Sequence, residues 1–102
     1  MRFLPFQAEF EEAIRSGAKT VTSRTRRYGQ INDVLHTPFG PVWLVGLYQV
    51  RLATVRDNFW RAEGVGSAEE FVETWVRLHP RKGFDPDQRV WLHEFEFLGE
   101  KP

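Results

Sequence analysis

The sequence contains no cysteine among its 102 residues, which excludes disulfide bridges and thiolate metal sites. No segment approaches the roughly 20 consecutive apolar residues that a membrane-spanning helix needs. The first segment, MRFLPFQAEFEEAI, lacks the pattern of a signal peptide because acidic residues interrupt its apolar ones. These absences predict a soluble, cytoplasmic protein with no membrane partner.

The chain also lacks net charge, since 14 Lys and Arg residues balance 14 Asp and Glu residues. Its charge is nevertheless unevenly distributed, because five basic residues and no acid occur between positions 15 and 27: Arg15, Lys19, Arg24, Arg26 and Arg27. A local basic face attracts phosphate even when the total charge is zero. Arginine outnumbers lysine, which suits planar, bidentate recognition, although a GC-rich genome or a warm habitat would give the same composition.

Length and composition predict a single domain over residues 1–102, with a core in which aromatic side chains, 15% of the sequence, are prominent. Apolar residues at helical spacing predict an amphipathic helix from Pro5 to Ser16. A capping-box pattern at Ser67 and Glu70 predicts a second helix that ends before Pro80. A short helical turn is expected at 57–63 and a loop at 81–88.

Strands are predicted from β-branched and aromatic residues at four places: 19–24, 34–36, 42–55 and 90–98. Gly46 lies inside the longest of these segments and is expected at a bend or bulge. Strands dominate and helices are few. We therefore predict an α+β fold, a small mixed β-barrel with about two to three peripheral helices.

Motifs for metal or nucleophilic chemistry are scarce. No two of His36, His79 and His93 have the spacing of a metal motif, and no GxSxG element is present. We therefore expect no metal and no cofactor. His93 lies among aromatic residues of a strand and is predicted to be a packed core residue, whereas His79 precedes the basic pair Arg81 and Lys82.

Two polar features remain open to alternative interpretations. Alternation along the first strand places Thr20, Thr22 and Arg24 on one face, which is either a solvated edge or the wall of a cleft. Glu63 stands beside Gly64, outside a regular helix, and is either a pocket-facing acid or a surface acid. Neither pattern decides the question by itself.

Together these segments resemble the ASCH domain family, small proteins with a PUA-like β-barrel. The family segment GxKxxExR is matched by Gly17, Lys19 and Arg24, with Thr22 where glutamate is commonest. The stretches EGVGSAEEF and HPRKGFDPDQRVWLHEFEF are similar to later parts of the family pattern. The resemblance implies a cleft between barrel and helices, and a link to RNA binding.

One branch of the family consists of amidohydrolases that cleave N4-acylated cytidines with a Lys/Thr/Glu set. The resemblance places that set on Lys19, Thr22 and Glu63. Thr22 would attack the acyl carbonyl, and Lys19 would take its proton, which requires a neutral amine. Because residues three apart on an ideal strand face opposite sides, Lys19 must lie in the turn after Gly17, or a bulge must intervene.

Three functions follow as hypotheses. The first is binding of RNA or of a nucleotide or nucleoside in a basic cleft, by residues spread over two segments: Arg24, Arg26, Arg27, Tyr28, Arg81 and Lys82, with Trp43 or Trp60 as further stacking surfaces. The second is amide hydrolysis by Lys19, Thr22 and Glu63. The third is a non-catalytic protein-interaction domain whose basic strand is only a solvated edge. The sequence leaves the oligomeric state undetermined.

Overall fold

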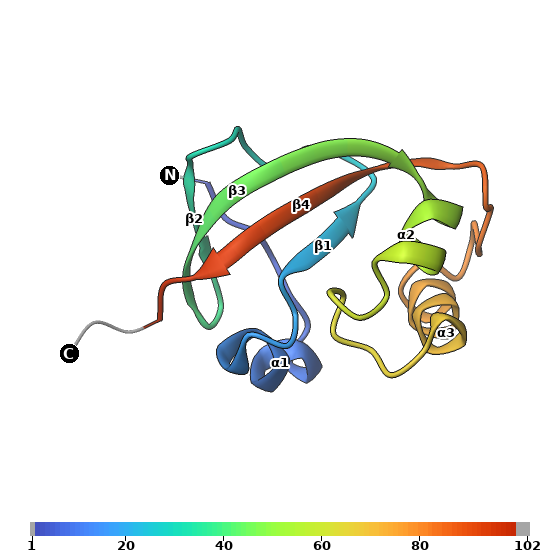
Figure 1. Cartoon of the computed structure of the whole chain (residues 1–102), viewed down its shortest axis with the longest axis horizontal. Coiled ribbons are helices and arrows are strands. Elements are labelled where there is room, and N and C mark those ends of the chain that lie inside the picture. Colours follow the sequence, from blue (N-terminus) through green and yellow to red (C-terminus); the bar gives the residue numbers. More distant parts are fainter. Residues whose placement is uncertain (1, 100–102) are drawn as a thin grey trace.

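The computed structural model describes residues 2–99. Four strands form one antiparallel sheet in the order β1-β4-β3-β2, and Figure 1 shows β3 and β4 arching over α1 and α3 as a half-barrel. The elements are a 3-10 turn η1 (Ala8–Phe10), α1 (Glu11–Ser16), β1 (Val21–Arg24), β2 (Val34–Thr37), β3 (Gly40–Arg51), α2 (Leu52–Asn58), α3 (Ala68–Leu78) and β4 (Arg89–Phe97). The α+β, barrel-like fold class is confirmed.

The predicted irregularity at Gly46 is confirmed and contributes to the curl of the sheet. The register between β3 and β4 shifts between Leu44 and Gly46. A Cβ atom on Gly46 would lie 2.5 Å from Glu94 Oε1 and 2.9 Å from the Tyr48 ring, so both side chains would have to move. A bulge bends a strand and increases its twist, which is what a half-barrel needs.

The first helix begins later than the sequence predicted. Residues 5–7 are not helical, a 3-10 turn follows, and α1 starts only at Glu11. The reason is tertiary, because the Pro5 carbonyl accepts a hydrogen bond from Arg24 and the Phe6 ring packs on Phe39 and Phe95. The predicted end is correct, since Gly17 adopts φ 85° and closes the helix.

The predicted strand 42–55 is wrong in its last four residues. β3 ends at Arg51, and Leu52 begins helix α2. Leu52 and Val55 are three residues apart, and both are fully buried on the inner face of that helix. Apolar residues suit both a strand and a helix, so the tertiary packing decided between them. The helical turn expected at 57–63 is correspondingly displaced, since α2 ends at Asn58 and turn residues follow.

Helix α3 begins as predicted. Ser67 is its N-cap, and its hydroxyl accepts a hydrogen bond from the Glu70 N–H at 3.0 Å. The Glu70 carboxylate reaches the N–H of Gly66 rather than that of Ser67, at 3.0 Å. The helix ends at Leu78, two residues before Pro80.

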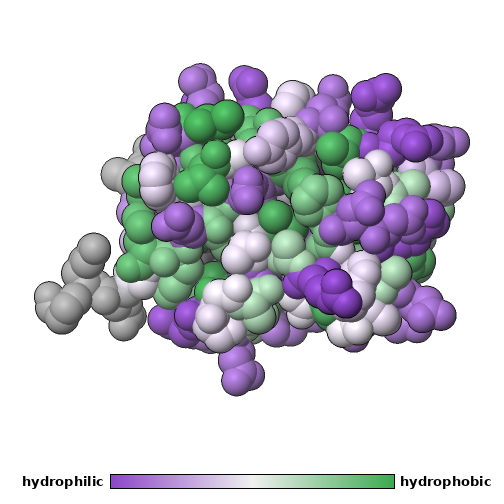
Figure 2. Space-filling view, viewed as in Figure 1, coloured by the Kyte–Doolittle hydropathy of each residue, from purple (hydrophilic) through white to green (hydrophobic). Residues whose placement is uncertain are grey.

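Two hydrophobic clusters fill the half-barrel. The first lies under the β2 end of the sheet and contains Leu4, Ile14, Leu35, Phe39, Val42, Leu44 and Phe95. The second joins the sheet to α2 and α3 and contains Val21, Leu52, Val55, Phe71, Trp75, Val90 and Leu92. On the face shown in Figure 2, hydrophilic side chains dominate the rim and hydrophobic ones are exposed between them. None of the helices in the described part of the chain is long and apolar enough to cross a membrane.

Candidate functional site

A cavity of about 280 Å³ lies between β1 and α3, and we call it the β1–α3 cavity. Its apolar lining comes from the segment before α1, the loop before α3 and α3 itself: Pro5, Phe6, Phe10, Val65, Phe71, Trp75 and Leu78. Its polar lining comprises Gln7, Lys19, Thr22, Ser23, Arg24, Glu63, Thr74 and His79. An apolar pocket with a few convergent polar groups is the usual form of a small-molecule site.

Lys19 and Glu63 form a buried ion pair in this cavity. Lys19 Nζ donates to Glu63 Oε1 and to the Glu63 carbonyl oxygen, each at 2.9 Å. Only 3% of Lys19 and 6% of Glu63 is exposed. The ammonium also lies 5.1 Å from the centre of the Phe10 ring. A buried charge pair of this kind holds two distant segments in one geometry.

The backbone brings these two residues together. The N–H groups of Thr20 and Val21 both donate to the Ala62 carbonyl, at 2.8 and 3.1 Å, which fixes Glu63 beside the start of β1. Lys19 precedes the strand, and its N–H donates to the Ala13 carbonyl at 2.9 Å. Of the two predicted alternatives, a turn after Gly17 or a bulge in the strand, the structure shows the first, and the strand begins two residues later than expected.

Ser23 is a member of the site that the sequence did not single out. Its hydroxyl donates to Glu63 Oε2 at 2.6 Å, so both carboxylate oxygens of Glu63 are engaged. Strand alternation places Ser23 opposite Thr22, yet both line the cavity at this short edge strand. A serine in a polar edge strand is common and matches no functional motif, so the sequence alone does not mark Ser23 as a site residue.

Thr22 and Arg24 are the other polar residues that β1 contributes to the cavity lining. Arg24 Nε donates to Thr22 Oγ1 at 3.0 Å, and the guanidinium lies 4.8 Å from the centre of the Phe6 ring and 5.4 Å from that of Tyr28. Burial lowers the pKa of Arg24 below its usual value, while Tyr28 and Glu63 oppose that shift. Among the described hydrogen bonds none joins Lys19 Nζ to Thr22 Oγ1. We call Lys19, Thr22, Ser23, Arg24 and Glu63 the polar cluster.

The opposite wall belongs to the end of α3. The His79 ring stacks on the Trp75 indole, with centroids 4.0 Å apart and planes inclined by 20°. His79 Nδ1 lies 3.0 Å from the Trp75 carbonyl oxygen, and the Trp75 indole N–H donates to the Gly83 carbonyl at 3.2 Å. His79 was expected beside Arg81 and Lys82, but it also lines the cavity.

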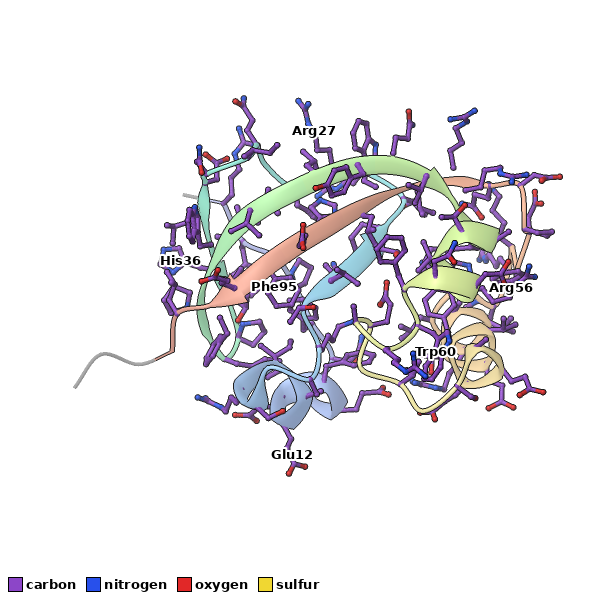
Figure 3. The ribbon with its side chains drawn as sticks, viewed as in Figure 1. Glu12, Arg27, His36, Arg56, Trp60 and Phe95 are labelled. Carbon is purple, nitrogen blue, oxygen red and sulfur yellow. The ribbon has the colours of Figure 1, made fainter. Side chains whose placement is uncertain are left out.

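The remaining predicted ligand-binding residues do not line the β1–α3 cavity: Arg26, Arg27, Tyr28, Arg81 and Lys82. Arg26 and Arg27 are exposed and lie over the Tyr28 and Trp91 rings. In Figure 3 Arg27 points away from the sheet, on the side opposite α1. Tyr28 touches the site indirectly, through Arg24. The stacking candidates Trp43 and Trp60 also lie outside the cavity.

His93 is fully buried, as predicted for a core residue. Its Nε2 accepts from the Tyr28 N–H at 3.0 Å, and its Nδ1 lies 2.9 Å from the Trp91 carbonyl oxygen. Burial lowers the pKa of His93 below 6.5 and Arg24 adds to that shift, while hydrogen bonds to the Trp91 and Thr22 backbone oppose it. Within residues 2–99 no three His, Asp or Glu side chains are grouped closely enough to hold a metal ion.

No protein-family model matches the chain, and no curated protein matches its sequence. Solved structures do match: a hypothetical protein, PH0355, has a TM-score of 0.73 and 19% identity over 92% of this chain and 95% of its own.

Two further matches are ASCH domains. The ASCH domain from Lactobacillus crispatus JV V101 has a TM-score of 0.74 and 14% identity, over 98% of this chain and 79% of its own. ASCH from Zymomonas mobilis has a TM-score of 0.65 and 18% identity over 92% of this chain, which spans only 65% of that protein. The chain therefore has the fold of an ASCH domain.

Proposed function

We propose that the chain binds a nucleoside-type ligand in the β1–α3 cavity. One observation carries the proposal: buried, hydrogen-bonded polar residues meet aromatic side chains at a single cavity. The aromatic side chains offer surfaces on which a planar base can stack. The polar cluster offers donors and acceptors for the base edge or for an attached carbonyl group.

Cavity size and charge support a nucleoside rather than a long strand. A volume of about 280 Å³ is close to the lower end, ~300 Å³, of small-molecule sites. Lys19 is neutralised by Glu63, and Arg24 is engaged with Thr22 and Pro5. The side chains freest to meet phosphate, Arg26 and Arg27, stand outside the cavity. The resemblance to RNA-linked ASCH domains makes a longer RNA the alternative ligand.

Calorimetric titration would separate the two ligands. Cytidine, N4-acetylcytidine and a short single-stranded RNA would be titrated at 50 and 200 mM salt. Nucleoside binding in the cavity predicts weak salt dependence and loss of binding in Phe10→Ala, with Arg26→Ala as the matched surface control. RNA binding that falls steeply with salt and fails in Arg26→Ala, without nucleoside binding, would overturn the proposal.

Amide hydrolysis is the second candidate, because Lys19, Thr22 and Glu63 all line the cavity. Thr22 Oγ would form a bond to the acyl carbon of an N4-acylcytidine, and the C–N bond would break. The hydroxyl proton would go to the leaving nitrogen, and water would then cleave the threonine ester. The net reaction consumes one N4-acylcytidine and one water molecule and yields cytidine and a carboxylic acid.

The chemistry depends on the ion pair of Lys19 and Glu63, because Lys19 is the base that would accept the Thr22 proton. Lys19 would accept the Thr22 proton as a neutral amine and pass it to the leaving nitrogen, and Glu63 Oε1, 2.9 Å from Lys19 Nζ, would hold that amine in place. Since Lys19 and Thr22 do not bond directly, the substrate or a water molecule has to bridge them. The Arg24 Nε–H, 3.0 Å from Thr22 Oγ1, would stabilise the developing alkoxide.

Ultraviolet spectroscopy of N4-acetylcytidine tests the second candidate. Thr22→Ala should lower the hydrolysis rate by more than about a hundredfold, since it removes the nucleophile, while Thr22→Ser keeps a hydroxyl and retains activity. Equal rates in wild type and Thr22→Ala would contradict the assignment. Binding without turnover would leave the binding proposal standing alone.

A further inference from the structure

His79 is held rigidly at the wall of the β1–α3 cavity that faces the polar cluster. Its ring stacks on Trp75 at 4.0 Å, and its carbonyl oxygen accepts from the Gly83 N–H at 2.9 Å. The Trp75 indole donates to the Gly83 carbonyl, so the three residues hold one another in place. A side chain fixed in this way is suited to forming a hydrogen bond with a ligand, because it loses little conformational entropy when the ligand binds.

The hydrogen bond to Trp75 determines which nitrogen of His79 carries the proton. A carbonyl oxygen only accepts, so Nδ1, 3.0 Å from the Trp75 oxygen, must be the N–H donor. In the neutral ring Nε2 is then an acceptor with a lone pair. Within residues 2–99 the hydrogen bonds of this ring include none to Nε2.

The polar cluster on the other wall is largely satisfied. Glu63 uses both carboxylate oxygens and Lys19 uses two of its three N–H groups. Thr22 Oγ1 already accepts from Arg24. What this wall has left to offer a ligand is mainly donors: the third Lys19 N–H and the Thr22 hydroxyl proton. His79 Nε2 is therefore a complementary acceptor across the cavity, beside the Thr74 hydroxyl of α3.

We propose that His79 Nε2 accepts a hydrogen bond from an N–H group on the ligand, so that the cavity selects bases with an amino group over bases with an oxo group at the same position. This inference rests on the proposed nucleoside binding. With an oxo group at that position, the ligand oxygen and His79 Nε2 are both acceptors, so no hydrogen bond forms and both atoms stay unpaired. His79 is thus a specificity-determining residue rather than part of a basic patch.

Two matched ligand pairs test the selection: cytidine against uridine, and adenosine against inosine. In calorimetric titrations at pH 7.5, wild type should bind the amino member on the order of tenfold more tightly. His79→Asn keeps an N–H near the position of Nδ1 but has no atom at Nε2, so discrimination should fall to within about twofold. His79→Gln carries an amide oxygen that can replace Nε2 and should restore part of the preference.

The matched control is His36→Asn, since His36 lies on β2 (Figure 3) and is not among the residues that line the cavity. It should leave both affinities and their ratio unchanged. If His79→Asn retains the full preference for cytidine, or wild type prefers uridine, the role of His79 is refuted and nucleoside binding still stands. If wild type binds no nucleoside, the proposed function itself fails. Circular dichroism melting of each variant shows whether a lost preference reflects unfolding.

Discussion

The polar cluster and the exposed arginines after it carry similar side chains in very different surroundings. Lys19 is 3% exposed and bonded to Glu63, whereas Arg26 and Arg27 are exposed and lie over the Tyr28 and Trp91 rings. All three belong to the one basic stretch from Arg15 to Arg27. Position in the fold, not charge, separates them.

The difference matters because burial changes what a charge does. A buried ion pair with fitting hydrogen bonds fixes geometry, and losing one partner leaves an unpaired charge away from water. An exposed arginine is solvated, screened by salt and free to move. We therefore expect changes in the polar cluster to alter stability and ligand binding together, while changes in the exposed arginines alter little.

The largest effect is expected from breaking the buried pair. Lys19→Met should lower the free energy of unfolding by about 3–5 kcal/mol, because the Glu63 carboxylate stays buried without its cation. The exposed pair of Arg51 and Asp87, 3.4 Å apart with side chains 58% and 78% exposed, is the comparison. Arg51→Met should cost at most ~1 kcal/mol. Urea denaturation measures both.

The double variant Lys19→Met/Glu63→Gln is the control for that experiment. It removes both charges, so it should recover part of the loss seen in Lys19→Met alone. Equal losses in Lys19→Met and Arg51→Met would contradict the view that burial distinguishes the two regions.

The next effect compares two glycines with the same backbone conformation. Gly64 and Gly17 have φ values of 87° and 85°, but a Cβ on Gly64 would lie 2.8 Å from Lys19 Cβ, whereas one on Gly17 meets nothing within 4 Å. Gly17→Ala should cost about 1 kcal/mol, the strain of a left-handed alanine. Gly64→Ala should cost clearly more and also weaken nucleoside binding. Equal costs in thermal melts, with binding intact, would show that Gly64 does not position Lys19.

A smaller effect concerns the buried His93. Because burial lowers its pKa in the folded state, the unfolded chain binds a proton more readily as the pH falls below about 6.5. The contribution of His93 to stability is therefore present above that pH and is progressively lost below it. Melting temperatures between pH 7.5 and 5.5 should fall more steeply for wild type than for His93→Asn, which cannot titrate. Parallel pH profiles would argue against a buried neutral His93.

The smallest effect is expected in the exposed region. Arg26→Ala and Arg27→Ala remove side chains that do not line the β1–α3 cavity, so nucleoside affinity should change by less than about twofold. Calorimetric titration at 150 mM salt measures this. A tenfold loss of affinity in either variant would indicate that the ligand binds to the exposed arginines and not in the cavity.

The fold was largely predictable because its signals are local. The helix after Ser67, the short strand at 34, the irregularity at Gly46 and the buried His93 each follow from a pattern within a few residues. The errors occur where distant contacts override local preference. Leu52 enters a helix whose first N–H bonds to Gln88, and Pro5 stays out of a helix while bonded to Arg24.

The candidate site was predictable only in part, for a related reason. Resemblance to a family pattern supplied Lys19, Thr22 and Glu63, which are up to 44 residues apart in sequence. Composition added Arg26, Arg27, Arg81 and Lys82, since sequence does not tell an exposed cation from one beside a cavity. Ser23 and His79 were missed as cavity residues because their roles depend on partners that only the folded backbone provides.

The most direct test is a crystal structure of the chain with N4-acetylcytidine bound. We predict the nucleoside between Phe10 and Trp75, within hydrogen-bonding distance of Lys19 Nζ and His79 Nε2. The same position with the acyl group removed would support the hydrolase. A nucleoside found on the Arg26 and Arg27 surface, with the β1–α3 cavity empty at millimolar ligand, would contradict the account.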